Sequence, residues 1–174
     1  MSEQQNHTDQ NQQERPMSQK TNVAIIGLFG GFFFSAFAYL AYYFHFMEVK
    51  PNFLISGWVP ARLSDGWAGF ILTVLLYGVL SIAVAFLYYF LLRKKDRLFV
   101  SIVFGAVVWG FVHFVLPPLF PDMPRVRELD LNTFVTTVCL YLVYGAFIGV
   151  SISYDETERR MKQELEEPSP EVKS

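Results

Sequence analysis

The chain has 174 residues, of which 52% are hydrophobic and 17% aromatic, and its formal net charge is −2. A single cysteine excludes a disulfide scaffold, and the lack of a basic excess argues against a nucleic-acid binder. The large apolar residues lie between two polar ends, so the mean hydropathy of +0.29 averages unlike segments and an ordinary soluble enzyme is disfavoured.

The chain begins with a polar leader, residues 1–22, which is rich in Gln, Asn and Glu. A segment with so few large apolar side chains cannot bury enough surface to fold, so we expect a disordered tail. Pro16 breaks any helix within it. The apolar segment that follows is longer than the core of a secretory signal, and we expect it to stay attached as a membrane anchor.

Four segments are long and apolar enough to cross a bilayer. A helix needs about 20 residues to span a hydrocarbon core of about 30 Å, where no water can satisfy an irregular backbone. The four segments are residues 23–46, 66–92, 98–116 and 132–154, and none contains Lys, Arg, Asp or Glu. The sequence therefore predicts an all-α polytopic membrane protein, with a four-helix transmembrane bundle over residues 23–154.

The distribution of basic residues predicts the orientation of this bundle. With four spans, both chain ends share one side with the short loop RKKDR, whose basic residues are Arg93, Lys94, Lys95 and Arg97. That side carries two, four and four Lys or Arg residues in its three segments, against two in each loop of the other side. We therefore expect both ends of the chain in the cytoplasm. The RKKDR side chains are expected to meet anionic lipid headgroups.

The C-terminal segment, residues 155–174, is highly charged and is expected to continue the last span as a cytoplasmic helix. Glu156 precedes Arg160 by four residues, and Glu158 precedes Lys162 by four, which is the favourable order for ion pairs along a helix.

Aromatic residues are expected to anchor both membrane interfaces. Trp58 and Trp67 lie at the outer one, and Tyr88, Tyr89 and Tyr154 at the inner one.

Small residues mark the faces on which the helices should pack. In lipid, close backbone approach replaces the hydrophobic effect as the force that holds helices together. Gly27, Gly31 and Ser35 recur every four residues on the first span, and Gly145 and Gly149 do so on the fourth. Packing within the chain is the favoured interpretation, and homodimerisation is the alternative.

Most residues with functional potential fall in one layer at the outer interface. They are His45, Glu48, Arg62, Asp65, His113 and Asp122. Histidines and carboxylates at one depth have the chemistry to bind a divalent metal or to shuttle a proton. Such residues near helix ends are more often solvated or paired with arginine, and no zinc-ligand spacing occurs, so we assign no metal site. His45 and Glu48 are three apart on a predicted helix and should share a face.

His113 lies about one turn inside the third span, deeper than the rest of this layer. A neutral imidazole bonded to a backbone carbonyl or a hydroxyl is the ordinary interpretation. The sharper hypothesis is an interhelix contact with Glu48 or Asp65. No Asp, Glu, Lys, Arg or His lies midway through the bilayer, which argues against an ion-coupled transporter.

No sequence pattern typical of an enzyme is present. The chain lacks a hydrolase elbow, HExxH, a phosphate-binding loop and CxxC, and Cys139 is a lone thiol within a span. We therefore expect a protein that is not an enzyme and has no cofactor.

Several segments together resemble one family. They are the polar leader, the four spans, the loop SGWVPARLSDGWAGF, the exit HFVLPPLFPDMP of the third span and the charged tail after SISYDE. This combination is similar to the YqhR-type membrane proteins of endospore-forming bacteria. The resemblance implies an uncharacterised protein of the bacterial cytoplasmic (inner) membrane and brings no catalytic residue with it.

The sequence thus favours a scaffold or accessory subunit that acts through its helix faces and its Pro-rich outer loop. Its partners would be the lipid bilayer and another membrane protein or a second copy of the chain. The alternative is a small-solute channel or permease subunit, in which the outer layer of His and carboxylates forms a vestibule.

Overall fold

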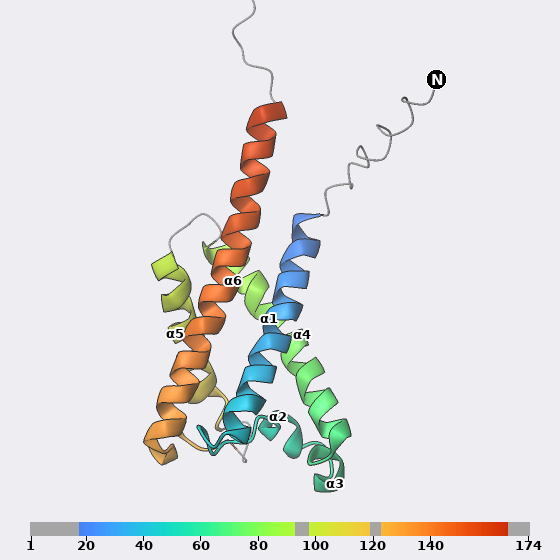
Figure 1. Cartoon of the computed structure of the whole chain (residues 1–174), viewed down its shortest axis with the longest axis vertical. Helices are drawn as coiled ribbons and strands as arrows, with labels where there is room; N and C mark the ends of the chain where they lie inside the picture. Colours follow the sequence, from blue (N-terminus) through green and yellow to red (C-terminus); the bar gives the residue numbers. More distant parts are fainter. Residues whose placement is uncertain (1–17, 93–97, 119–122, 167–174) are drawn as a thin grey trace, which may run out of the picture.

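The structure is a computed structural model that describes residues 18–92, 98–118 and 123–166 (Figure 1). Within these residues every regular element is helical. The elements are α1 (Gln19–Tyr43), α2 (Phe53–Ser56), α3 (Ala61–Ser64), α4 (Trp67–Leu92), α5 (Leu98–Val115), the 3-10 helix η1 (Val126–Glu128) and α6 (Leu131–Glu166). The helices α1, α4, α5 and α6 are long and apolar enough to cross a membrane, which confirms the predicted all-α polytopic bundle.

The four long helices run alternately up and down. The start of α1 and the end of α6 therefore lie at one end of the bundle, here named the terminal end, and α2 and α3 lie at the other, the loop end (Figure 1). α1 packs along α4 and α5 packs along α6, while α1 and α6 join the two pairs. The successive helices α4 and α5 meet at the terminal end, where the hydroxyls of Tyr88 and Ser101 are 3.0 Å apart.

The first helix begins at Gln19 rather than at the predicted Val23, so residues 19–22 are not part of a disordered tail. The reason is tertiary. Gln19 and Asn22 are hydrogen-bonded to Glu156 and Asp155 of α6, and these bonds hold the first turn in helical form where its own composition favours neither state. Residues 1–17 of the predicted tail lie outside the described residues.

The end of α1 also differs from the prediction, because the helix stops at Tyr43 instead of Phe46. His45 adopts a left-handed backbone conformation with φ of 60°. Its N–H donates to the carbonyl of Tyr42 at 3.0 Å, and the N–H of Phe46 donates to that of Ala41 at 2.9 Å. These two bonds form a Schellman motif, which satisfies the last carbonyls and turns the chain away from the helix axis.

The last helix is the longest element of the fold. It starts at Leu131, after Asp130 accepts a hydrogen bond on its side chain from the N–H of Asn132 at 3.1 Å. Its 36 residues, at about 1.5 Å each, extend about 54 Å, well beyond a hydrocarbon core of about 30 Å. The predicted helical extension is therefore confirmed as far as Glu166.

Ion pairs four residues apart run along this extension. Both predicted pairs form, at 3.2 Å between Arg160 and Glu156 and at 2.7 Å between Lys162 and Glu158. A third joins Arg159 to Asp155 at 3.0 Å.

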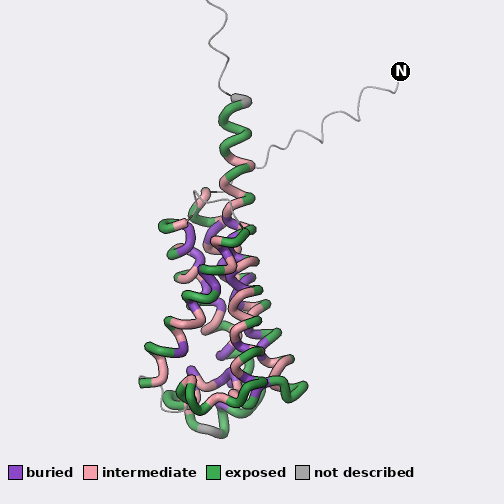
Figure 2. Tube along the Cα trace, turned by 90° about the vertical axis from the view of Figure 1, so that its left-hand side faces the viewer, coloured by how far each residue is buried: buried purple, intermediate pink, exposed green. Residues whose placement is uncertain are grey.

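The terminal half of the bundle is held by direct contact between helix backbones. A Cβ atom on Gly31 would lie 2.5 Å from the carbonyl oxygen of Tyr77, and one on Gly145 would lie 2.5 Å from the backbone nitrogen of Gly105. Gly27 and Ser35 are buried on the same face of α1, and Gly149 lies against Ser101. The small residues singled out in the sequence thus lie at contacts within the chain. Figure 2 shows the buried segments along the interior of the bundle.

Two tyrosines depart from their expected place in this half. Tyr88 is fully buried and Tyr89 is 6% exposed, whereas the sequence pattern placed both at the membrane interface. Tyr88 packs edge-on against Phe104 with ring centroids 5.0 Å apart. Tyr88 bonds to Ser101 inside the bundle and Tyr89 bonds to Gln19 at the terminal end, so both rings pack within the protein instead of facing lipid headgroups. Tyr154, Trp58 and Trp67 are 70%, 82% and 85% exposed.

The loop half is built differently, because the connection between α1 and α4 folds back into the bundle. Residues 47–55 carry the buried side chains Met47, Pro51, Asn52, Leu54 and Ile55. The hydroxyl of Tyr77 donates to the carbonyl of Pro51 at 3.3 Å. This buried loop segment occupies the space that α4 and α5 leave between them at their loop ends.

Candidate functional site

The sequence pointed to the loop end, and there the structure separates His45 from Glu48. The two residues lie beyond the end of α1, so the prediction that they share a helical face is wrong. The side chain of His45 is exposed on the left-handed turn. The backbone N–H of Glu48 donates to Thr133 Oγ1 of α6 at 2.9 Å, while its carboxylate is exposed. Glu48 therefore fixes the chain through its backbone.

An ion pair closes the loop between α1 and α4. Lys50 Nζ lies 2.5 Å from Asp65 Oδ1, and the two side chains are 40% and 59% exposed. The hydrogen bond and the charge of Lys50 lower the pKa of Asp65, and the same hydrogen bond raises the pKa of Lys50. The buried Asn52 supports the pair, since its Nδ2 donates to the carbonyl of Ser64 at 3.0 Å. Arg62, on α3, is exposed.

A polar hollow of about 560 Å³ opens beside this ion pair at the loop end. It brings together Glu48 and Asp65 from the predicted layer and adds Glu128 and Asp130 from the opposite connection. Neither His45 nor His113 lines it. Among the described residues, no three His, Cys, Asp or Glu side chains are grouped so that they could hold a metal ion.

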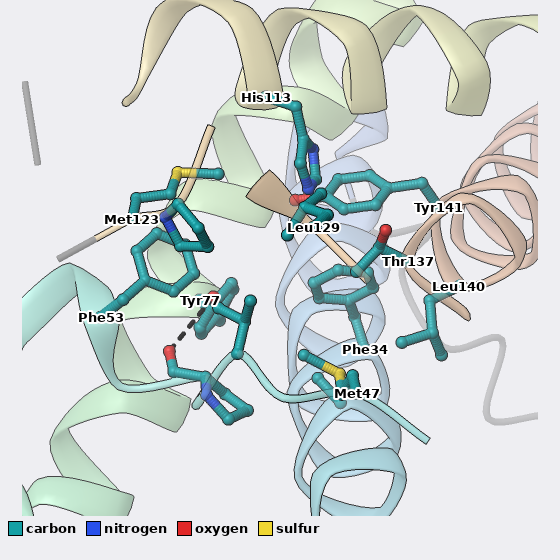
Figure 3. Close-up of a pocket in the computed structure, with 14 residues that line it drawn as sticks. Phe34, Met47, Phe53, Tyr77, His113, Met123, Leu129, Thr137, Leu140 and Tyr141 are labelled. Carbon is teal, nitrogen blue, oxygen red and sulfur yellow. Dashed lines mark hydrogen bonds between the residues drawn. The ribbon is translucent and has the colours of Figure 1, made fainter. Parts of the chain in front are cut away.

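His113 lines a separate, interior cavity of about 40 Å³ (Figure 3). Its Nδ1 lies 3.0 Å from the carbonyl oxygen of Trp109, so in the neutral ring Nδ1 carries the proton and Nε2 is free to accept. The ring stacks on Trp109 at 4.8 Å and meets the edge of Tyr141 at 5.8 Å. The indole N–H of Trp109 in turn donates to Thr137 Oγ1 of α6 at 3.3 Å.

The surroundings of His113 are those of a satisfied core residue. Apart from Tyr77, Tyr141 and Thr137, the cavity walls are apolar, and Figure 3 shows Met47 and Phe53 of the loop and Met123 of the second connection closing it. Its polar contacts are to α5, while the carboxylate of Asp65 is paired with Lys50. Among these described side chains, the structure therefore shows no contact of His113 with Glu48 or Asp65, the sharper of the two hypotheses.

Several predicted residues lie outside the described part of the chain. They are Asp122 of the outer layer and the headgroup-binding set Arg93, Lys94, Lys95 and Arg97.

Sequence reasoning missed a polar cluster at the terminal end, here named the terminal cluster and made of Gln19, Asn22, Tyr89, Asp155 and Glu156. Tyr89 Oη donates to Gln19 Oε1 at 2.7 Å, and Gln19 Nε2 donates to Glu156 Oε2. Asn22 Nδ2 donates to Asp155 Oδ1 at 2.8 Å. Together these bonds join α1, α4 and α6. The sequence did hold a signal for this cluster. Two amide side chains stand just before the first predicted span and two carboxylates just after the last, and with four spans these positions share one membrane face.

The fold and these contacts define a four-span α-helical membrane protein whose last helix projects beyond the bundle. The family described as "Conserved membrane protein YqhR" matches residues 3–167, so the chain belongs to this family of conserved membrane proteins. The chain is 40% identical over 156 residues to "Uncharacterized protein YqhR" of Bacillus subtilis (strain 168), which covers 87% of this chain and 88% of that protein. No solved structure matches the chain. The family resemblance predicted from the sequence is confirmed.

Proposed function

We propose that this protein is a non-enzymatic accessory or scaffold subunit of the bacterial cytoplasmic membrane, with both ends in the cytoplasm. It would act by presenting the projecting part of α6 to a partner protein. The observation that carries the proposal is the continuity of α6, which runs as one helix from the loop end through the bundle and out at the terminal end (Figure 1).

The projecting part of α6 is built to hold a fixed direction. Its first turn outside the bundle is bonded to α1 through the terminal cluster, and the turns beyond carry ion pairs four residues apart. Each exposed pair adds only about 0.3–0.5 kcal/mol, but together they favour a continuous helix over a frayed tail. A rigid arm is what a docking element needs, because less conformational freedom is lost on binding.

This projecting part of α6, residues 154–166 and here named the arm, also exposes apolar side chains among its charged ones. Tyr154 and Met161 are 70% and 53% exposed, and their spacing of seven residues puts them on one face of the helix. A helix that presents such a face to a hydrophobic groove is a common mode of recognition. The charged residues around this face would supply specificity for the partner.

The small cavities inside the bundle favour a role through contacts with other proteins over a role in solute transport. The cavities that border Tyr77 and Tyr141 have volumes of about 40 and 80 Å³. Spaces of this size hold a few water molecules. A solute pathway would need the buried loop segment to leave the bundle. Transport of a small solute is therefore kept as the alternative function, and the experiment below distinguishes the two.

The test places a photoreactive amino acid at the exposed Gln163 and illuminates cells that produce the full chain. We expect one discrete protein adduct, retained in the matched variant Met161→Leu and reduced at least fivefold in Met161→Asp. An adduct that is absent, or equal in both variants, would contradict docking through the arm. Solute flux into liposomes containing the purified chain, above that of empty liposomes, would favour a channel instead.

A second measurement checks the orientation. In a Cys139→Ser background, Gly57→Cys should react with an impermeant maleimide added to intact cells, and Gln163→Cys should react only after lysis. The reverse pattern would place the arm outside the cell and overturn the proposal.

A further inference from the structure

An apolar groove of about 580 Å³ lies between α1 and α6. Phe33 and Phe37 of α1 form one wall, and Val143 and Phe147 of α6 form the other. Gly30 lies where the helices are closest, since a Cβ there would lie 2.6 Å from Ile148 Cδ1. Phe46, after the end of α1, lines the groove toward the loop end. The groove thus runs from the middle of the bundle to the loop end.

The hydroxyl groups that line this groove are already bonded within the protein. Thr136 Oγ1 donates to the carbonyl of Phe46 at 3.1 Å, and the hydroxyls of Tyr144 and Ser81 are 2.6 Å apart. The walls are strongly exposed, with Phe33 at 56%, Val143 at 65% and Phe46 at 60%. Both flanking helices are membrane spans, so this surface faces hydrocarbon and its occupant must be apolar.

The groove fits a chain of methylene groups better than it fits another helix. Helices associate in lipid through small residues that let their backbones approach. In this protein the small residues on α1 and α6 are used within the chain, at Gly31 against α4 and at Gly145 against α5. The groove walls carry bulky aromatic and branched side chains instead. A flexible chain can follow such walls, whereas a helix backbone would be held away from them.

We propose that this groove binds one acyl chain of a phospholipid from the membrane leaflet at the loop end. Its volume lies within the range of about 300–1,000 Å³ typical of small-molecule sites. The lipid enters from the loop-end leaflet because Phe46 and Val135 line the groove on that side, while Gly30 and Phe147 lie near the middle of the spans. A lipid held there packs against both α1 and α6, which also meet directly through Phe33 and Phe147, with ring centroids 6.1 Å apart.

Native mass spectrometry of the full chain, extracted from vesicles of phosphatidylethanolamine and phosphatidylglycerol, tests this proposal. We expect one phospholipid to remain on the wild-type chain after detergent exchange. Val143→Trp fills the groove and should lower that occupancy at least fivefold. The matched control is Val79→Trp on α4, a residue that is 61% exposed and does not line the groove, and it should keep the lipid. Unchanged circular dichroism and Tm show that each variant is folded.

Cys139 provides a second measurement, because it is the one cysteine of the chain and lines the groove. Its alkylation by N-ethylmaleimide in detergent should accelerate several-fold when lipid is stripped from the wild type. A folded wild type that retains no lipid, or a Val143→Trp protein that retains as much as wild type, would overturn the proposal. A dimer that Val143→Trp converts to a monomer would show that a second chain fills the groove, and would also overturn it.

Discussion

The interiors of the two halves of the bundle are filled in different ways. In the terminal half, glycines bring helix backbones together, and the fully buried Ile148 and Ala85 fill the remaining space. In the loop half, side chains of the buried loop segment, Met123 and the rings around His113 fill the space between the helices. Close backbone packing leaves little room to rearrange, whereas a core built partly from loop side chains keeps small cavities.

The largest expected effect comes from enlarging a glycine in the terminal half. A Cβ on Gly145 would lie 2.7 Å from the carbonyl oxygen of Ser101 and only 2.4 Å from the Cα of Gly105. Because backbone atoms cannot swing away, Gly145→Val should force α5 and α6 apart and destabilise the protein by about 3 kcal/mol or more. Thermal unfolding in detergent, followed by circular dichroism, measures this.

Gly110→Ala is the matched control for that variant. Gly110 lies on α5, and a Cβ there would meet nothing within 4 Å. It should leave Tm unchanged or raise it, since alanine favours a helix over glycine by about 1 kcal/mol. Equal loss of stability in both variants would mean that glycine contacts do not distinguish the terminal half.

The next effect is confined to the loop half. Leu54 is 7% exposed in the buried loop segment, while Leu63 of α3 is 54% exposed. Leu54→Ala should cost about 2 kcal/mol by creating a cavity, and Leu63→Ala should cost little. Hydrogen exchange should speed up in residues 47–66 for Leu54→Ala and stay unchanged in the terminal half. Faster exchange throughout the bundle would show that the two halves unfold as one unit.

The contrast between the halves also explains which features of the fold can be predicted from the sequence and which cannot. A helix contact face repeats every four residues, so spacing alone indicated the face of Gly27, Gly31 and Ser35, and a lack of charge over about 20 residues identified the spans. No regular residue spacing predicts the burial of Leu54 and Ile55. They lie in a short segment between Pro51 and Pro60, and their burial depends on space left by α4 and α5.

Polar residues were harder to place for the same reason. Tyr88 and Tyr89 follow the pattern of interfacial anchors, but their hydroxyls bond to Ser101 and Gln19, which belong to other helices. By contrast, the ordinary interpretation of His113 as bonded to a backbone carbonyl agrees with the structure, because its partner is the carbonyl of Trp109, one turn earlier on the same helix. Residue spacing reports such local partners well and distant ones poorly.

A smaller effect, of opposite sign, is expected at the end of α1. His45 has a left-handed backbone at φ of 60°, which glycine adopts without the steric cost of a Cβ. His45→Gly should therefore stabilise the protein by about 0.5–1 kcal/mol. If the exposed imidazole of His45 had a binding role, the variant would lose that function while gaining Tm. A lower Tm would contradict the Schellman motif.

The smallest effect concerns the ion pair that closes the loop. Lys50 lowers the pKa of Asp65, so the stability that this carboxylate contributes is present above an unfolded-state pKa of about 4 and is lost as pH falls through the lower folded value. The raised pKa of Lys50 works in the other direction, and its contribution is lost as pH rises through that value, above about pH 10. The pair is therefore intact across the neutral range.

Lys50→Met should raise the pKa of Asp65 toward its ordinary value, as followed by the NMR shift of its carboxyl carbon. Because both side chains are well exposed, the variant should leave Tm near neutral pH almost unchanged, whereas a large loss would mean that this pair, rather than Leu54 and its neighbours, holds the loop in the bundle.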